Sequence, residues 1–283
     1  MAIRKLLVAS AGGVMLLATG AAQAADVYAA SPAPAMAAPA KEDWYLTLGV
    51  SVRGEPQYPG SENYEAVFSP VISLKKASGL NAFDSIDDNP SIALFDTGKF
   101  RIGATGKLDL GRDEDDSDKL RGLGNVDPSL EIGAFTEFYP WDWLRLRAEL
   151  RYGFGGFEGL GGDIGADVIV PIADSWRFAM GPRLSFASSS YMNTYFGVTP
   201  FQSISATFLG NPLPVYSASG GIDQVGVTAQ LDKMFANGVI VGVYGTYGRL
   251  LNSAADSPLT EDENVFMAGI SVAYAFNIGK SWW

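Results

Sequence analysis

The sequence predicts an all-β fold, a transmembrane antiparallel up-and-down β-barrel of twelve strands, or of ten strands if residues 77–98 form only a loop. Three observations predict it. Apolar and polar residues alternate in ten segments, short and long connections alternate between these segments, and a secretory signal precedes them all.

Residues 144–154 show the alternation most clearly. Every even position is apolar, whereas the odd positions carry Arg145, Arg147, Glu149 and Arg151. The 100° step of a helix would scatter these charges around its surface, so only a period of two separates the two sets. The apolar set is long enough to cross a hydrocarbon core at a tilt. Because a charge on the lipid side would cost roughly 2–4 kcal/mol near the midplane, the charged face must line the interior.

The chain divides into three parts. Arg4 and Lys5, an apolar run at 6–18 and small residues at 22–24 predict a signal peptide over residues 1–24. Residues 25–42 are rich in Ala and Pro and predict an extended periplasmic leader, and residues 43–283 form the barrel. Removal of the signal peptide would make the net charge of −11 more negative by two, which disfavours nucleic acid as a partner.

The composition excludes several kinds of site. There is no cysteine for a disulfide or a thiolate metal site, and no histidine for Ser-His or Asp-His hydrolysis or for metal binding. We therefore expect a protein that is not an enzyme, with no catalytic, cofactor-binding or metal-binding residues and no cofactor. The acidic run at 113–118 offers carboxylates to a divalent cation, but its spacing matches no calcium loop, so we interpret it as a solvated outer loop.

The other strands are predicted from the same period of two. We expect strands at residues 44–53, 64–75, 100–110, 130–138, 144–154, 163–172, 177–186, 225–231, 239–247 and 266–276. Pro70 slightly weakens the second of these. Residues 77–98 form either a short hairpin or an irregular loop. Because two periplasmic chain ends need an even number of strands, the count is twelve or ten, and about twenty residues per strand with its connection favour twelve.

Twelve charged side chains fall on the faces predicted to line the barrel interior. Neighbouring strands carry opposite signs, which favours ion pairs that fill a narrow barrel over a charged lining that selects a solute. We therefore predict that the lumen is mostly blocked by this charge network. Its members are Arg101, Lys107, Glu131, Glu137, Arg145, Arg147, Glu149, Arg151, Asp163, Asp167, Arg177 and Arg183.

The tryptophans fall at one predicted end of the barrel. Indole rings prefer a membrane interface, where the ring is apolar and its N–H finds a polar partner. We predict one layer of such rings near the periplasmic boundary and an outer girdle of Tyr64, Tyr152, Phe154, Tyr247 and Phe266. The interface aromatics at the periplasmic boundary are Trp44, Trp141, Trp143 and Trp176, with Trp282 and Trp283 after the last strand and Tyr274 and Phe276 within it.

Several motifs resemble the MipA/OmpV family of outer-membrane proteins, the MltA-interacting protein family. They are Tyr58-Pro59-Gly60-Ser61, the run GRDEDDSDKLRGLGNVDPSLEIGAF, the segment YMNTYFGVT with Tyr195, Phe196, Gly197 and Val198, Arg249-Leu250, AADSP at 254–258, and the closing Tyr274-Ala275-Phe276. The tail at 277–283 departs from the family, which usually ends near its Tyr-x-Phe. The apolar residues at 195–198 form either a recognition surface or a loop folded into the barrel mouth, and we favour the loop.

The resemblance implies a barrel in the outer membrane of a Gram-negative cell. One branch of the family has a scaffolding role towards peptidoglycan enzymes, and other branches are associated with adhesion and with stress or antibiotic response. We expect a monomer that contacts outer-membrane lipid, the barrel assembly machinery and peptidoglycan-processing enzymes. Two function classes stay open: a structural, scaffolding or interaction barrel of the cell envelope, and a porin-like diffusion channel for small solutes.

Overall fold

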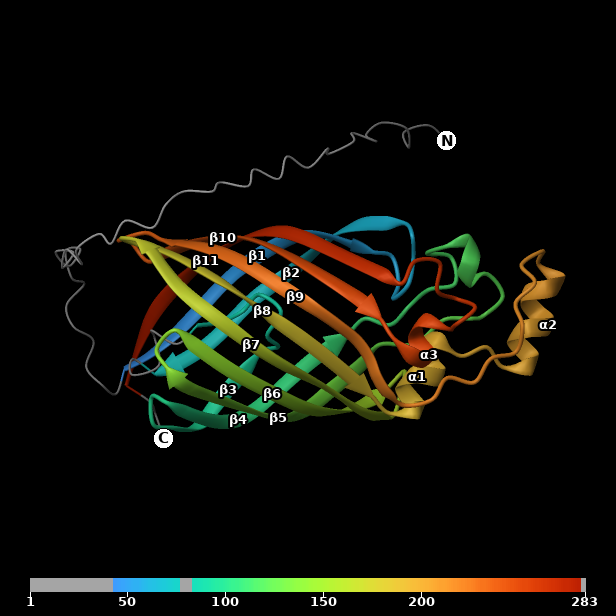
Figure 1. Ribbon diagram of the computed structural model, residues 1–283, viewed down its shortest axis with the longest axis horizontal. Coiled ribbons are helices and arrows are strands. Elements are labelled where there is room, and N and C mark those ends of the chain that lie inside the picture. Colours follow the sequence, from blue (N-terminus) through green and yellow to red (C-terminus); the bar gives the residue numbers. More distant parts are fainter. Residues whose placement is uncertain (1–42, 77–82, 281–283) are drawn as a thin grey trace, which may run out of the picture. The chain divides into compact units, whose positions relative to one another are not determined.

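The computed structural model describes residues 43–76 and 83–280. Within these ranges the chain forms eleven strands of one antiparallel sheet, which curls into a barrel (Figure 1). This confirms the predicted fold class. The strands are β1 (Asp43–Pro56), β2 (Tyr64–Lys76), β3 (Ser91–Asp96), β4 (Phe100–Asp109), β5 (Ser129–Trp141), β6 (Leu144–Gly155), β7 (Gly159–Ala173), β8 (Trp176–Ala187), β9 (Gly221–Met234), β10 (Val239–Leu250) and β11 (Asn264–Lys280).

Neighbouring strands in the sheet follow the order β2-β1-β11-β10-β9-β8-β7-β6-β5-β4-β3. Each strand from β3 to β11 pairs with the next in sequence, and β1 pairs with β11, so the first and last strands of the barrel lie side by side. Short turns join β3 to β4, β5 to β6, β7 to β8 and β9 to β10 at one end, here called the inner end. The long connections lie at the opposite, outer end.

The period of two sorts side chains as the sequence predicts. Ile132, Leu150 and Ile164 point outward and are 49–54% exposed, whereas Glu137 and Arg145 on the opposite faces are each 1% exposed. The exposed apolar face is the reverse of a water-soluble sandwich, which buries its apolar face. Among the described residues, no helix is long and apolar enough to span a bilayer.

Of residues 77–98 the structure describes 83–98, and these contain one strand, β3. The alternative of a loop alone is wrong, because β3 is a strand, and residues 83–90 form an irregular segment that contacts the interior. The first strand of the alternative hairpin, at 80–85, lies mostly outside the described residues. Both β2 and β3 run from the outer towards the inner end, as their pairing with β1 and β4 requires. The chain therefore has to return towards the outer end between β2 and β3. Residues 83–90, here called the internal segment, are the described part of that return. Because they are not a strand, the described residues form eleven strands, an odd number.

The final strand is longer than predicted. Instead of ending at Phe276, β11 continues to Lys280, whose partner in β1 is Asp43. The Asn277 side-chain amide donates to the Asp43 carboxylate (3.1 Å) and the Tyr45 hydroxyl (3.2 Å), which ties this extension to β1. The tail residues up to Lys280 therefore belong to the last strand of the barrel. Trp282 and Trp283 lie outside the described residues.

The four described tryptophans lie at the inner end, because each sits at a strand start or at a short turn. Trp141 and Trp143 are 57% and 50% exposed and stack at 5.4 Å, and Trp176 lies under the Lys233 ammonium at 4.7 Å. Trp44 differs from the expected interface ring, since it is only 7% exposed. The register between β1 and β11 shifts at Trp44 and Tyr45, which interrupts the alternation there.

The remaining aromatic positions follow the predicted ends. Tyr152 contacts Phe154 at 5.0 Å and Tyr247 contacts Phe266 at 4.9 Å, near the outer ends of their strands. Tyr274 contacts Phe276 at 4.6 Å near the inner end.

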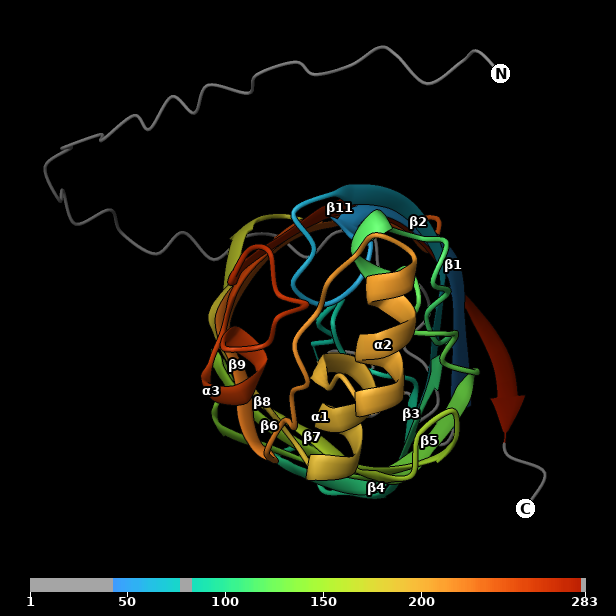
Figure 2. The ribbon, with the colours of Figure 1, turned by 90° about the vertical axis from the view of Figure 1, so that its right-hand side faces the viewer.

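Three helices, unexpected from the sequence, lie among the outer connections. They are α1 (Ser189–Phe196), α2 (Pro200–Phe208) and α3 (Asn252–Ala255), with a short 3₁₀ helix, η2 (Asp118–Leu120), in the connection after β4. Figure 2 views the barrel from this end, where α1 and α2 lie in front of its opening. The α2 helix begins with a capping box, in which the Thr199 and Gln202 side chains accept from each other's backbone N–H groups. Pro200 in the first turn has no N–H that would need a partner.

Replacement of Phe83 by alanine tests the contribution of the internal segment to the fold. Phe83 is 1% exposed and lies against the guanidinium groups of Arg145 (5.6 Å) and Arg177 (5.1 Å). Phe83→Ala should lower the free energy of unfolding by about 3–5 kcal/mol, as burial and packing are lost. The measurement is urea unfolding in micelles, followed by tryptophan fluorescence. Phe208→Ala is the control, because that ring is 87% exposed, and equal effects of the two changes would contradict a packed internal segment.

Candidate functional site

The interior of the barrel is built around Arg145. Its strand register places it beside Asp167 of β7 and one pair away from Glu137 of β5. The guanidinium donates to Asp88 (2.5 Å), Glu137 (2.7 Å) and Asp167 (2.9 Å), and the residue is 1% exposed. One buried cation is therefore neutralised from two strands and from the internal segment.

Glu137 collects a second set of donors. Its two carboxylate oxygens accept from Arg101 (2.7 Å), Arg145 (2.7 Å) and Arg147 (2.6 Å). Three guanidinium groups share one carboxylate because β4, β5 and β6 are adjacent and their odd-numbered positions face inward. Neutralisation of that one carboxylate would remove one ion-pair partner from each of the three arginines.

The network continues towards the outer end along β6. Arg147 contacts Glu149, and the Arg151 guanidinium donates to Glu149 (2.7 Å), Glu131 (3.0 Å) and Asp163 (2.7 Å). Lys107 then lies 3.3 Å from Glu131. On the other side, Asp167 accepts from Arg183 at 2.6 Å.

These contacts join eleven of the twelve predicted residues into one continuous set of ion pairs. The exception is Arg177, which lies 3.4 Å from Asp232 instead. Here the term lumen network means the joined residues Arg101, Lys107, Glu131, Glu137, Arg145, Arg147, Glu149, Arg151, Asp163, Asp167 and Arg183.

Sequence reasoning missed the acidic residues of the internal segment. Asp87 lies 2.6 Å from Arg183, Asp88 lies 2.5 Å from Arg145, and Asp84 lies 2.6 Å from Lys75. A signal for them existed, because the twelve predicted lumen charges hold seven basic and five acidic groups. An excess of buried positive charge requires further acids, and the acidic run beside Pro90 was the unplaced source.

Neutral side chains also fix the internal segment to the wall. The Gln230 amide oxygen accepts from the Ile86 N–H (2.8 Å), and the Thr228 hydroxyl donates to Asp87 (2.9 Å). The Asn89 amide donates to Glu149 at 2.9 Å. The segment is therefore bound on both sides of the lumen, to β6 and to β9.

Burial decides the energetics of this site. Glu131, Glu137, Arg145 and Asp167 are each 2% exposed or less. Transfer of a charge out of water costs several kcal/mol, so such groups persist only where ion pairs and hydrogen bonds replace the lost hydration. Each buried charge therefore stabilises the barrel only while its ion-pair partners are present.

The motif residues at 58–61 lie at the outer end, where they join two connections. The Tyr58 hydroxyl donates to the Leu259 carbonyl (3.1 Å) and lies 2.9 Å from Glu261, and burial together with that carboxylate raises the pKa of Tyr58. Gly60 has a φ of +93°, which favours glycine, and its carbonyl accepts from the N–H groups of Glu261 (2.7 Å) and Asp262 (3.1 Å). Pro59 and Ser61 complete this turn, and Ser61 is 1% exposed.

The motif residues at 195–198 lie in the same region. Tyr195, Phe196 and Val198 are each 3% exposed or less, and Gly197 caps the end of α1. The Tyr195 hydroxyl donates to Asp109 (2.9 Å), and the Phe196 carbonyl accepts from the Ser257 hydroxyl (2.7 Å), which belongs to the AADSP motif. These buried side chains form two apolar clusters, here called the outer cap, as a loop folded into the barrel mouth requires.

The acidic run after β4 uses its carboxylates within its own loop. Glu114 accepts from the N–H groups of Gly122 (2.9 Å) and Gly124 (3.0 Å). Asp113 accepts from the backbone N–H of Asp115 (3.0 Å) and from the Asn125 side-chain amide (3.0 Å). Across residues 43–76 and 83–280, no group of three or more acidic side chains is arranged to hold a metal ion.

Conversion of Glu137 to glutamine tests the lumen network. The substitution keeps the shape but removes the charge that three arginines share, so the free energy of unfolding should fall by about 3–5 kcal/mol. Glu263→Gln is the matched control, because Glu263 forms an exposed pair with Arg249 at 2.8 Å, and it should change stability by about 1 kcal/mol or less. Urea unfolding of both variants measures the difference, and a small effect at Glu137 would show that the network is not under this constraint.

Comparison with solved structures finds outer-membrane proteins of low similarity. An outer membrane channel from Pseudomonas putida F1 is 10% identical, with 87% of this chain and 99% of that chain covered and a TM-score of 0.42. The outer membrane channel DcaP of Acinetobacter baumannii is 8% identical, with 82% and 96% covered and a TM-score of 0.36. OmpT of Vibrio cholerae is 9% identical, with 83% and 97% covered and a TM-score of 0.33.

Comparison with curated proteins finds no match. A sequence profile described as MltA-interacting protein MipA matches residues 48–276, which include every strand except the terminal residues of β1 and β11. The match covers most of the chain and agrees with the motifs at 58–61, 195–198 and 254–258. The chain therefore belongs to the MipA family.

Proposed function

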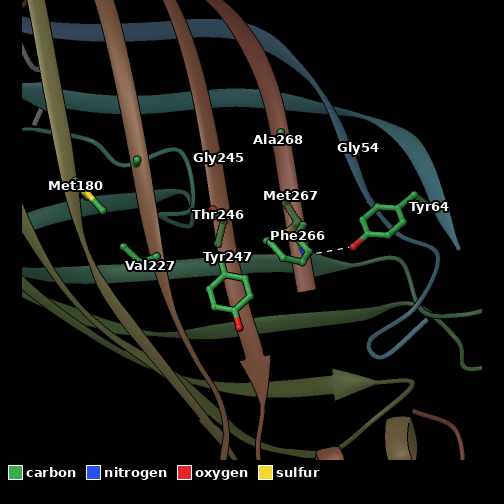
Figure 3. Close-up of a pocket in the computed structure, with 11 residues that line it drawn as sticks. Gly54, Tyr64, Met180, Val227, Gly245, Thr246, Tyr247, Phe266, Met267 and Ala268 are labelled. Carbon is green, nitrogen blue, oxygen red and sulfur yellow. Dashed lines mark hydrogen bonds between the residues drawn. The ribbon is translucent and has the colours of Figure 1, made fainter. Parts of the chain in front are cut away.

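We propose that this protein is a closed, non-enzymatic β-barrel of the Gram-negative outer membrane that acts as a structural or interaction protein of the cell envelope. The location is supported by the outward apolar face and by the aromatic pairs near both strand ends, which suit a bilayer and its two interfaces. An apolar groove of about 510 Å³ lies on that outward face. Figure 3 shows residues that line it, among them Tyr64, Tyr247 and Phe266. Water is a poor solvent for such a surface.

The burial of the lumen network is the observation that supports a closed barrel. Arg101, Arg147, Glu149 and Arg151 point into the barrel, yet each is only 5–7% exposed. A continuous passage wide enough for water would expose side chains that line it, as in barrels that conduct solutes. The internal segment adds further bulk at the same depth, between β6 and β9.

A planar bilayer measurement separates the closed barrel from the alternative, a diffusion channel for small solutes. The purified chain should give no stepwise current above the leak of the bilayer, because paired side chains occupy the path of the ions. Stepwise, ion-selective currents would support the channel instead.

Insertion of the protein has to be shown in the same preparation, so that an absence of current is not attributed to a closed lumen when the protein is missing. The chain has no cysteine, and Asp118 is an outer-loop residue whose side chain is 91% exposed. An Asp118→Cys variant reconstituted in vesicles should therefore react with a membrane-impermeant maleimide.

The interaction role is supported by the family, whose description names a protein that interacts with MltA. We extend this to the present chain, with the inner turns as the surface for a periplasmic enzyme that processes peptidoglycan. Asp142 and Asp174 are exposed acids on two of these turns. They are therefore suitable positions at which to alter the surface without touching the lumen network.

Charge reversal at the inner turns tests the interaction. Asp142→Lys with Asp174→Lys should weaken binding of purified MltA to the chain in nanodiscs by about tenfold or more, since rim charges of the wrong sign disfavour association. The matched control is Asp118→Lys at the outer end. Binding that is absent in the unchanged chain, or lost equally with the outer change, would contradict an inner-face interaction. Surface plasmon resonance provides the affinities.

A further inference from the structure

One basic side chain lies on the outward face of the barrel at its inner end. Lys233 is the last residue but one of β9. Its neighbour Asp232 is 3% exposed and pairs with Arg177 in the interior, so the alternation of the strand directs Lys233 outward. A cation therefore ends a row of side chains that otherwise suits hydrocarbon. The outward residues before it in β9 are Val225, Val227, Ala229 and Leu231.

Two aromatic rings hold the Lys233 ammonium. Its nitrogen lies 4.7 Å from the centroid of the Trp176 ring and 5.1 Å from that of the Phe235 ring. Trp176 is the direct register partner of Lys233 on β8. The Met234 N–H donates to the Ser175 carbonyl (2.8 Å), which keeps the two ring-bearing segments side by side. The ammonium is therefore held at one place on the barrel by its contacts with both ring faces.

The charge of Lys233 has no acidic partner in the described part of the chain. There its contacts are the two rings, and no carboxylate pairs with it. In contrast, every cation of the lumen network faces a carboxylate. An ammonium has three N–H donors, and a ring face attracts its charge without offering a strong acceptor. Lys233 therefore presents both a charge and hydrogen-bond donors to the surroundings of the barrel.

The depth of Lys233 identifies these surroundings. Its partner Trp176 begins β8 directly after a short inner turn, and the stacked pair of Trp141 and Trp143 lies at another turn of the same end. Indole rings in such a layer mark the boundary between hydrocarbon and headgroups. In the membrane location given above, Lys233 thus lies level with lipid phosphate groups, where a basic side chain is well accommodated.

Apolar side chains adjoin the ammonium on the side of the membrane midplane. Leu231 lies two residues before Lys233 and faces the same way, and its register partners are Phe178 of β8 and Val243 of β10. A molecule bound at Lys233 has hydrocarbon contacts available here, which a lipid can use and a free phosphate ion cannot. The faces of Trp176 and Phe235 are already engaged by the ammonium, so they do not offer a site for a choline group.

We propose that Lys233, held by Trp176 and Phe235, binds the phosphate group of an anionic phospholipid of the phosphatidylglycerol type in the leaflet at the inner end. The proposal rests on the membrane location in the proposed function. The ammonium donates to phosphate oxygens, and the acyl chains lie against the apolar side chains around Leu231. A headgroup with net negative charge neutralises Lys233, whereas phosphatidylcholine carries a cation of its own, which weakens the attraction.

Native mass spectrometry of the purified chain tests the site, because it counts the lipids that stay bound to one protein molecule. The probes are phosphatidylglycerol and phosphatidylcholine with identical acyl chains. Lys233→Gln removes the charge, and Lys233→Arg keeps it. Lys99→Gln is the matched control, because Lys99 is an exposed residue of the β3–β4 turn at the same end, and none of the described rings is in cation–π contact with it.

The unchanged chain should bind phosphatidylglycerol about fivefold more tightly than phosphatidylcholine, the factor expected for one basic group near an anionic headgroup. Lys233→Gln should remove this preference, whereas Lys233→Arg and Lys99→Gln should keep it. No preference in the unchanged chain, or equal losses with the two glutamine variants, would overturn the proposal. Excess inorganic phosphate should leave the lipid bound. Its displacement by phosphate would assign the site to the free ion and overturn the lipid as occupant.

A separate measurement distinguishes failure of this site from failure of the membrane location. The chain has no cysteine, so Leu150→Cys places a single thiol on the outward face in the middle of β6. In nanodiscs this thiol should be protected from a membrane-impermeant maleimide. Free reaction would refute the membrane location and the site with it. Protection of the thiol without a lipid preference would refute the site alone.

Discussion

A charge inside a membrane barrel must have a partner, and most of this structure depends on how that requirement is met. Arg145 is 1% exposed and contacts Asp88, Glu137 and Asp167 within 2.9 Å. Because uncompensated burial would cost several kcal/mol, the strands must be aligned so that acids and bases coincide. Strand register, the inward face and the return of the internal segment all satisfy this one condition. Hydrophobic burial sets the opposite face, where the apolar side chains remain exposed for lipid.

The fold and much of the lumen could be predicted because they follow from local pattern. A period of two assigns each strand residue to a face, and the presence of charge decides which face points inward. For residues 144–154 this required no knowledge of the neighbouring strands. The twelve lumen residues were selected in the same way, and all twelve form ion pairs with the geometry described above. Pairing by sign was also predictable, since acidic and basic strands alternate in sequence.

The remaining features depend on contacts between distant parts of the chain. The internal segment has no periodicity, and its place is set by Arg145, Arg183 and Gln230, which lie far away in sequence. The helices α1 and α2 are short, and their stability comes from packing in the outer cap rather than from a strong local signal. Likewise, β11 extends to Lys280 because β1 offers partners there. Pro70 weakens the prediction of a strand from sequence, yet it lies on an edge, where a missing N–H is tolerated.

The filled lumen and the shortness of β3 (Ser91–Asp96) have the same origin. The internal segment directly precedes β3 and could have lengthened that strand along β4. Its acids Asp87 and Asp88 instead offset the excess of arginine in the interior. A segment that pairs with Arg145 and Arg183 cannot at the same time hydrogen-bond to the edge of β4 beyond Gly106. Charge balance in the lumen is thus obtained from residues that would otherwise be free to lengthen β3, so neutralisation of the internal arginines and a longer β3 are alternatives for this sequence.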